Sequence, residues 1–279
     1  MKKILVATDL SSRADRAILR AIKLAKNYKA HLTIIHIIDE DTPKSILEET
    51  KKIAKQEINL CLKGKLVGVK HDIQIIVGVA HVDILKIVNK EEIDLVVLGL
   101  HRHIKEDQPM VGKVIERVIK SSMKPVLVVK NRSESDYKNI LVGVDFNIHS
   151  KKSLKLSLSM FQDGTFNLLH SYYMPFAGMI GNSTASLEKE FKATCNADLD
   201  DMISEVTKSL PKKAGKAYKI NKKIVKGSIL DILQEEITFS KPELLVLGTH
   251  GRTFLSRALS LNVTEKFLAN PSCDVLAVM

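Results

Sequence analysis

The stretch that decides the fold is KILVATD at residues 3–9, because it returns as NILVGVD at residues 139–145. Two further apolar stretches also recur: LVVLG at 95–99 returns as LLVLG at 244–248, and VLVV at 126–129 returns as VLAV at 275–278. The first match has an offset of 136 residues and the later ones an offset of 149, so the second copy carries a net insertion of 13 before its fourth strand. The sequence therefore predicts an internal duplication.

Within each copy, short apolar runs alternate with longer amphipathic segments, which is typical of βαβ units around a parallel sheet. In the first copy we expect strands near 3–8, 31–38, 71–77, 93–98 and 125–129, and helices near 11–27, 44–62, 81–90 and 112–122. Such doubly wound sheets bind ligands beyond the carboxyl ends of their strands, where the strand order reverses. We expect two α/β domains, residues 1–133 and 137–279, joined by a polar linker.

Composition limits the remaining choices. A chain of 279 residues has room for about two domains, and its 45% hydrophobic and 27% charged residues argue against disorder. The net charge of +11 permits anionic partners such as nucleotides or nucleic acid without selecting among them. The three cysteines are isolated, which argues against a disulfide framework or a cysteine metal site. No apolar run approaches the roughly 20 residues of a membrane span, so we expect a cytoplasmic protein.

An aspartate ends the first strand of each copy, Asp9 in one and Asp145 in the other. Each carboxylate is expected at the mouth of a crevice, where it could accept hydrogen bonds from an amine or a sugar hydroxyl. The alternative is that Asp9 caps the helix beginning near Ser11. Duplication does not decide between the two, because copies inherit caps as readily as binding sites.

The loop after the fourth strand is rich in glycine and basic residues, GTHGRT at 248–253 and GLHRH at 99–103. Glycines let backbone N–H groups approach a phosphate closely. A helix is expected to follow, at Gly112 in one copy and near Asn262 in the other, with an N-terminal dipole that favours an anion. An ordinary turn and helix cap would explain the same residues, and Asn262 has capping-box spacing.

These residues carry a resemblance to the universal stress proteins, in a tandem form with two copies of the family fold. The resemblance rests on VLGTHGR at 246–252, on the aspartate ending each first strand, on PVLVV at 125–129 and on HSYYMPF at 170–176. It implies two five-stranded parallel sheets of the adenine nucleotide alpha hydrolase-like type, with strand order 3-2-1-4-5. It also implies that the halves pack as an intrachain pseudo-dimer through their final strands, 126–129 and 275–278.

Nucleotide-binding members of that family show Gly, two residues, Gly, nine residues, then Gly followed by Ser or Thr. In the first half Gly99 and Gly112 match this pattern, whereas Arg102 and Lys113 stand at the other two places. Arg102 and Lys113 could replace lost hydrogen bonds with charge, or they could fill an empty pocket. By the same resemblance Asp9 and Ile37 would face an adenine.

In the second half Gly248 and Gly251 match the pattern, and Arg252 follows them. Leu261 and Asn262 stand at the last two places, and a leucine side chain would obstruct a backbone that must meet phosphate. The first half is therefore the better candidate. Together the resemblance implies a non-enzymatic protein in which Mg-ATP or a related adenine nucleotide regulates association with unidentified protein partners, and a further homodimer is left open.

Other functions have weaker signals. There is no P-loop, no G-x-G-x-x-G, no H-E-x-x-H and no G-x-S-x-G, so we expect no catalytic residues, although a weak ATPase is kept as an alternative. A nucleotide-free interaction module with both crevices closed is the other alternative. His101, His103 and His250 are expected to be surface residues rather than metal ligands. Aromatic residues make up only 5% of the chain, which makes nucleic-acid binding unexpected.

Overall fold

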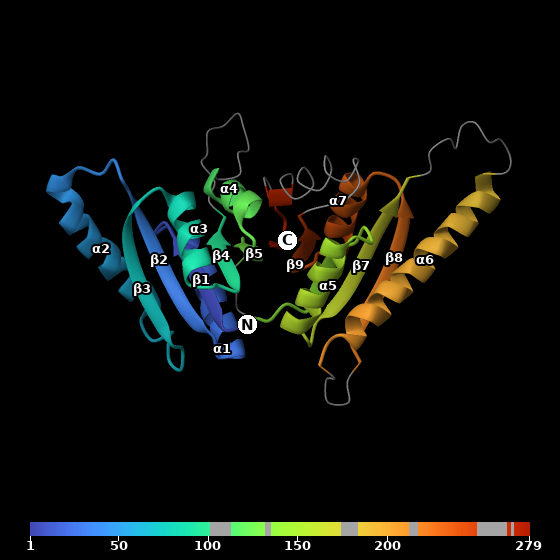
Figure 1. Cartoon of the computed structure of the whole chain (residues 1–279), viewed down its shortest axis with the longest axis horizontal. Helices are drawn as coiled ribbons and strands as arrows, with labels where there is room; N and C mark the ends of the chain where they lie inside the picture. The colour runs from blue at the N-terminus through green and yellow to red at the C-terminus, as the bar shows by residue number, and fades with distance from the viewer. Residues whose placement is uncertain (101–112, 132–134, 174–183, 212–216, 250–266, 269–270) are drawn as a thin grey trace. The chain divides into compact units, whose positions relative to one another are not determined.

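The computed structural model describes residues 1–100, 113–131, 135–173, 184–211, 217–249, 267–268 and 271–279. The described residues of the first repeat form alternating strands and helices (Figure 1): β1 (Lys3–Thr8), α1 (Ala14–Tyr28), β2 (His31–Asp39), α2 (Lys44–Leu62), β3 (His71–Gly78), α3 (Ala80–Lys90), β4 (Leu95–Gly99), α4 (Lys113–Ser121) and β5 (Val126–Val129). The expected strands and helices of this repeat are therefore present, with boundaries shifted by at most three residues.

The described elements of the second repeat follow the same order as far as the fourth strand, β9. This repeat contains β6 (Asn139–Gly143), α5 (Ile148–Met160), β7 (Thr165–Tyr172), α6 (Thr184–Lys208), β8 (Lys219–Lys226), α7 (Ile229–Ser240), β9 (Leu244–Gly248) and β10 (Asp274–Val278). The expected insertion lies between β7 and β8. It includes a longer helix, since α6 has 25 residues and its counterpart α2 has 19.

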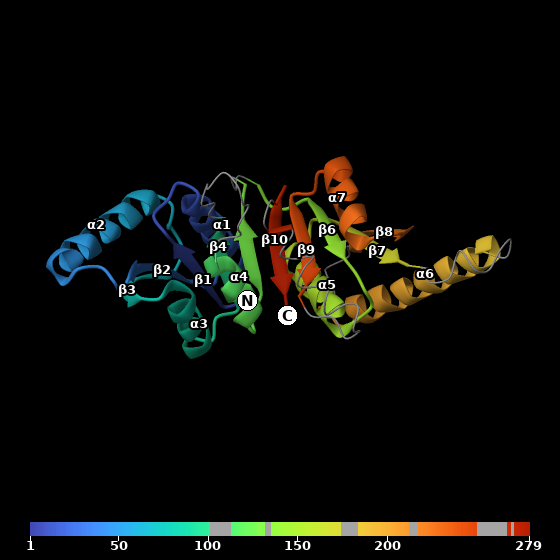
Figure 2. The same cartoon turned by 90° about the horizontal axis from the view of Figure 1, so that it is seen from above.

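Each repeat is doubly wound around a parallel-dominated sheet. In the first repeat the strand order is β3-β2-β1-β4-β5 with every neighbouring pair parallel, which is the expected 3-2-1-4-5 order. Helices α1 and α2 cover one face of this sheet, and α3 and α4 cover the other (Figure 2). The second repeat shows the order β8-β7-β6-β9, with α5 and α6 on one face and α7 on the other.

Strand β10 belongs to the second repeat in sequence but packs with the first. It pairs with β5 in antiparallel register, with Val275 opposite Val128 and Ala277 opposite Val126, so the expected pairing of the two final strands is confirmed. The contacts accordingly divide the chain into one compact unit of residues 1–135 with 265–277, and a second of residues 136–264 with 278–279. The first unit therefore contains a strand from the far end of the chain.

The core of each unit is formed by apolar strands covered on both faces. Ile4, Leu5 and Val6 of β1 are fully buried, as are Leu95 and its neighbours in β4. The two central strands of the second unit repeat this pattern, with full burial in the middle of β6 and β9. Burial on both sides of the pleat explains why these stretches are continuous apolar runs rather than alternating ones.

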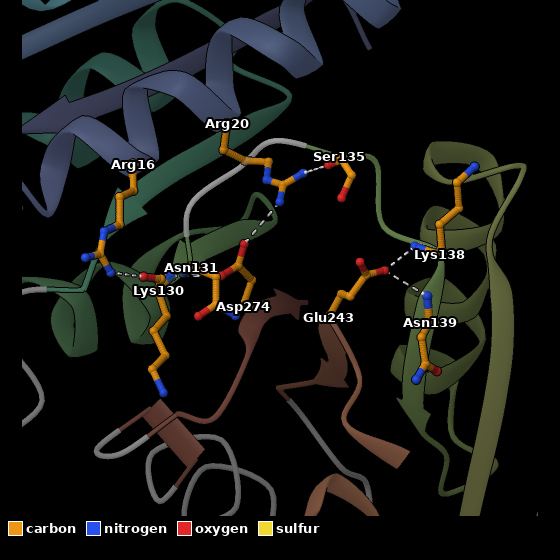
Figure 3. A network of polar contacts seen from close by, with 9 residues as sticks. All are labelled: Arg16, Arg20, Lys130, Asn131, Ser135, Lys138, Asn139, Glu243 and Asp274. Carbon is orange, nitrogen blue, oxygen red and sulfur yellow. Dashed lines mark hydrogen bonds and ion pairs between the residues drawn. The ribbon is translucent and has the colours of Figure 1, made fainter.

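In each repeat a carboxylate accepts hydrogen bonds from the backbone at the beginning of the central strand, β1 or β6. Asp94 Oδ2, just before β4, accepts hydrogen bonds from the backbone N–H groups of Lys2 and Lys3, the latter at 3.0 Å. Glu243, just before β9, does the same for Lys138 and Asn139 (Figure 3), with 3.0 Å to Asn139 N. Partial burial opposes ionisation of Asp94, but these hydrogen bonds hold its pKa below the ordinary value.

Candidate functional site

The strand order reverses between β1 and β4 in the first repeat and between β6 and β9 in the second. We name these places the first and second switch points. Asp9 directly follows β1, Gly99 ends β4, and Ile37 lies near the end of β2. Thr8 is opposite His36 in the neighbouring strand, so Asp9 and Ile37 lie at the same end of adjacent strands. The structure thus brings these three predicted residues together at the first switch point.

The turn after β1 places Asp9 without using it as the cap of α1. Leu10 adopts a left-handed conformation with φ 63°, and Asp9 Oδ1 accepts a hydrogen bond of 3.0 Å from Ser11 N. Helix α1 begins only at Ala14, whose N–H donates to Ser11 Oγ at 3.2 Å. The alternative that Asp9 caps this helix is therefore wrong, because the left-handed residue delays the helix by three positions.

The same conformation occurs after β6, where Phe146 has φ 60°. A left-handed backbone is costly for large side chains such as those of Leu10 and Phe146, and such strain persists only where surrounding contacts enforce it. Strained residues of this kind gather at functional sites. The repeat of the strain at both switch points is a feature that hydrophobic patterning did not predict.

The carboxylate of Asp145 is held by side chains of its own turn. Asp145 Oδ1 accepts a short hydrogen bond from Ser150 Oγ, and Asp145 Oδ2 accepts one of 2.7 Å from the side chain of Asn147. Asn147 also caps α5, with its Oδ1 accepting from Ser150 N at 2.8 Å. The corresponding places in the first repeat hold Ser11 and Ala14. Alanine at the place of Ser150 removes the hydroxyl that engages the carboxylate.

A histidine to which the sequence analysis assigned no role supports each strained turn. His36 Nδ1 lies 2.9 Å from the carbonyl oxygen of Thr8, and His170 Nδ1 lies 2.8 Å from that of Val144. Because a carbonyl oxygen only accepts, Nδ1 carries the proton in both rings. These carbonyls immediately precede Asp9 and Asp145. The signal in the sequence is that a histidine occupies the sixth position of the second strand in both copies.

His170 is the more buried of these histidines, with 9% of its surface exposed. Its ring stacks against Phe146 with the ring centroids 4.2 Å apart. Burial lowers the pKa of His170 below its ordinary value, although the hydrogen bond to Val144 and the charge of Asp145 act in the opposite direction. The buried ring therefore favours the neutral form at the second switch point.

Gly99 and Gly248 have a packing role that is independent of any ligand. A Cβ atom on Gly99 would lie 2.9 Å from the Cα of Ala14, and one on Gly248 would lie 3.2 Å from the backbone carbon of His149. Each glycine thus allows the first turn of a helix to pack directly against the end of the fourth strand. This requirement accounts for both glycines whether or not a phosphate binds nearby.

Several predicted residues lie outside the described part of the chain. These are Arg102, Gly112, Gly251 and Arg252, together with His101, His103, His250, Leu261 and Asn262. Lys113 is the first residue of α4. The described residues at the switch points therefore comprise the part expected to face an adenine, but not the loops expected to meet phosphate.

Several lysines outside the switch points are paired with carboxylates. Lys120 Nζ lies 2.5 Å from Glu116 on α4. On the edge strand β8, Lys222, Lys223 and Lys226 pair with carboxylates of the adjacent helices, Asp200, Glu236 and Glu188, at 2.5–2.8 Å. This pairing reduces the positive potential that the lysine-rich sequence suggests, and exposed lysines protect a sheet edge from strand addition.

The described residues hold neither a metal-binding cluster nor a membrane-spanning helix. No three His, Cys, Asp or Glu side chains there are grouped closely enough to hold a metal ion. In the same part of the chain, no helix combines the length and the apolar surface needed to cross a membrane.

Fold and switch points together define a tandem α/β protein with two doubly wound repeats, each with an aspartate and a strained turn where its strand order reverses. A sequence model of the universal stress protein family matches residues 1–130 and again residues 136–279. The chain therefore belongs to the universal stress protein family, and each repeat matches the family once.

Individual relatives agree with this assignment. Universal stress protein MJ0577 of Methanocaldococcus jannaschii is 33% identical over 157 residues, covering 47% of this chain and 96% of that protein. Universal stress protein MJ0531 of the same organism is 31% identical over 139 residues, covering 46% and 82%. The crystal structure of a universal stress protein from Archaeoglobus fulgidus aligns with a TM-score of 0.67 at 16% identity, over 99% of this chain and 97% of that one. This last similarity concerns the fold.

Proposed function

We propose that this universal stress protein binds an adenine nucleotide, Mg-ATP in the first instance, at the first switch point, and that binding regulates association with a protein partner. The observation that carries the proposal is the difference between the two aspartates. The side chains of Ser150 and Asn147 engage both carboxylate oxygens of Asp145, and the first repeat has Ala14 at the place of Ser150. The Ser150 hydroxyl therefore competes with a ligand for Asp145, whereas an alanine at the same place cannot compete for Asp9.

The described residues fit the base and sugar of such a nucleotide. Asp9 is exposed and Ile37 is half-buried, so a carboxylate acceptor and an apolar side chain lie at the same end of neighbouring strands. An adenine offers an amino donor and an apolar ring face, and a ribose offers hydroxyl donors, which are the groups that this pair can contact. A bound Mg²⁺ would supply charge neutralisation to the phosphates.

The direct test is to identify and titrate the ligand. Purified protein is denatured, released nucleotide is identified by mass spectrometry, and Mg-ATP is titrated calorimetrically into the wild type, Asp9→Ala and Asp145→Ala. We expect binding that Asp9→Ala weakens by about tenfold or more, as for the loss of a charge-assisted hydrogen bond, and that Asp145→Ala leaves within about twofold. Equal losses in the two variants would contradict the assignment to the first switch point.

A second candidate function is a nucleotide-free interaction module. The observation that favours it is the packing of Gly99 against Ala14 and of Gly248 against His149, which explains these glycines without a phosphate. This function predicts no released nucleotide and no heat on titration. The same experiment therefore separates the two candidates.

We propose binding rather than turnover because the sequence contains no P-loop, no H-E-x-x-H and no G-x-S-x-G motif. The proposed compartment is the cytosol, which fits the free thiols of Cys61, Cys195 and Cys273. A steady release of phosphate from Mg-ATP that remains after extensive purification and disappears in Asp9→Ala would instead favour the ATPase alternative.

A further inference from the structure

The first compact unit is completed by β10, the last strand of the second repeat. β10 pairs with β5 along Val275, Leu276 and Ala277. It opens with Asp274, a carboxylate that is fully buried. Burying a charge is costly unless it is paired and hydrogen-bonded. The partners of Asp274 therefore show which groups of the first unit stabilise β10 at this edge.

Both carboxylate oxygens of Asp274 face the first repeat (Figure 3). Asp274 Oδ1 accepts hydrogen bonds of 2.9 Å from the backbone N–H groups of Lys130 and Asn131, which directly follow β5. Asp274 Oδ2 lies 3.8 Å from Nη2 of Arg20 on α1. The incoming strand thus satisfies the end of β5 and places a negative charge beside a guanidinium.

Arg20 is buried as deeply as a core residue, with 5% of its surface exposed. Its Nη1 donates a hydrogen bond of 2.9 Å to the carbonyl oxygen of Ser135 in the linker. One turn earlier on α1, Arg16 Nη1 donates to the carbonyl oxygen of Lys130 at 2.7 Å. Removing one member of a buried ion pair typically destabilises strongly, because the other charge remains buried without its partner.

The duplication shows that neither repeat carries both members of this pair. Helices α1 and α5 correspond with an offset of 136, because buried Ala14, Ala17 and Ala21 match buried Ser150, Ser153 and Ser157. By this correspondence Arg20 is replaced by Leu156 in the second repeat. Strands β5 and β10 correspond with an offset of 149, so Asp274 is replaced by Pro125 in the first. The arginine belongs to one repeat and the aspartate to the other.

We propose that Arg20 and Asp274 make the pairing of the final strands specific for unlike repeats. The β5 edge of the first unit accepts a strand that begins with a carboxylate, which is β10, and it discriminates against β5 of a second copy of this chain. Pairing β5 with another β5 would bring Pro125, which carries no charge, to the buried guanidinium of Arg20. The proposal is independent of nucleotide binding.

The test is a double-mutant cycle in the full-length chain, using Arg20→Leu, Asp274→Asn and the double variant. Arg20→Leu installs the residue of the second repeat, and Asp274→Asn keeps a carbonyl oxygen for Lys130 N and Asn131 N. The matched control is Arg16→Leu, which removes an arginine of the same helix that bonds the linker but not Asp274. Hydrogen exchange measures the protection of the β10 amides. Light scattering across a range of protein concentrations measures the molecular mass in solution, and hence the oligomeric state.

We expect each single variant to lower the protection of β10 on the order of a hundredfold, and Arg16→Leu to lower it far less. If the two substitutions acted independently, the loss of β10 protection in the double variant would equal the product of the two single losses. We expect the loss to be about tenfold or more smaller than that product, because the double variant does not bury either charge of this pair without the other. The masses should also differ. Arg20→Leu removes the barrier to pairing of two β5 strands, so its mass should rise with concentration above that of the wild type, whereas Asp274→Asn keeps Arg20 and should not gain mass.

Three results would overturn the proposal. The first is an equal loss of β10 protection in Arg20→Leu and Arg16→Leu. The second is independent, multiplicative effects of the two substitutions in the double variant. The third is an equal gain of mass in Arg20→Leu and Asp274→Asn. If Arg20→Leu alone does not fold, folding of the double variant supports the proposal and its failure to fold contradicts it.

Discussion

The two repeats share their packing and differ in their chemistry, most clearly on α1 and α5. At matching buried positions α1 has Ala14, Ala17 and Ala21, whereas α5 has Ser150, Ser153 and Ser157. Only small side chains fit there because each helix packs closely against its sheet. Two of the serines donate to carbonyl oxygens of their own helix, but Ser150 donates to Asp145. Alanine and serine are both small enough for this close packing, so the fold is preserved. The added hydroxyl of Ser150 changes the hydrogen bonding of the aspartate at the second switch point.

This comparison suggests how a duplicated fold can separate two tasks. In the first repeat Ala14 stands at the place of Ser150, whereas in the second repeat the Ser150 hydroxyl donates to Asp145. At the other end of the chain the second repeat supplies Asp274, which the first unit requires. We therefore propose that the first repeat binds the ligand and that the second contributes to assembly.

The largest expected difference between the repeats concerns the two strand-end glycines. Gly99→Ala places Cβ 2.9 Å from a backbone atom of Ala14, which cannot move without shifting α1, whereas Gly248→Ala has 3.2 Å to its nearest neighbour. We expect Gly99→Ala to lower the free energy of unfolding by about 3 kcal/mol and Gly248→Ala by about 1 kcal/mol, the range found for overpacked sites. Urea denaturation measures both. A larger loss for Gly248→Ala would break the comparison.

The next prediction exchanges Ala14 and Ser150, the matching residues near the two aspartates. Ala14→Ser should give Asp9 the hydroxyl contact that Asp145 has, and should weaken Mg-ATP binding by about tenfold. Ser150→Ala removes a buried hydrogen bond and should cost about 1 kcal/mol of stability with no loss of nucleotide affinity. Calorimetric titration and urea denaturation check the two outcomes. Unchanged affinity in Ala14→Ser would show that the serine contact does not govern ligand binding.

A smaller effect concerns pH and the buried His170. Because burial lowers its pKa in the folded protein, the unfolded chain binds more protons below about pH 6.5, the ordinary histidine value. Stability should therefore be complete above that pH and fall as the pH drops through it. His170→Asn keeps an N–H donor for the Val144 carbonyl oxygen and should flatten this decline. Thermal unfolding between pH 7.5 and pH 5.5 tests it, and a decline unchanged in His170→Asn would assign it to other groups.

A last prediction concerns the reactivity of Cys61 in the first repeat. Burial raises the pKa of its thiol to about 11, and the hydrogen bond to Asp15 and the negative charge of that residue act in the same direction. At pH 8 its thiolate fraction should be on the order of a hundredfold below that of a free cysteine. Alkylation followed by peptide mass spectrometry measures the rate. The variant Asp15→Asn should speed this alkylation, and an unchanged rate would contradict the role of the carboxylate.

Much of the fold was predictable because local patterns encode it. Short apolar runs that recur at offsets of 136 and 149 residues predicted the duplication, the strands and the position of Asp9 at the end of β1. The strained turns were not predictable in this way. Leu10 and Phe146 are ordinary apolar residues in the sequence, and their left-handed backbone is imposed by neighbouring strands. His36 and His170 could have been found by comparing the two copies position by position.

The Arg20–Asp274 pair could not be predicted from local sequence because its members are brought together only by the antiparallel pairing of β5 and β10. Expecting that pairing does not reveal which helix residue meets the first residue of β10. The comparison of Asp274 with Pro125 becomes informative only when the register is known. Long-range charge pairs of this kind therefore require the structure.

The most direct measurement of the central claim, that the repeats share a fold but only the first keeps a ligand site, is the stoichiometry of Mg-ATP binding to the full-length chain. We predict one nucleotide per chain, with binding weakened by about tenfold or more in Asp9→Ala and retained in Asp145→Ala. Two equivalent sites per chain, or a single site lost in Asp145→Ala, would contradict the account.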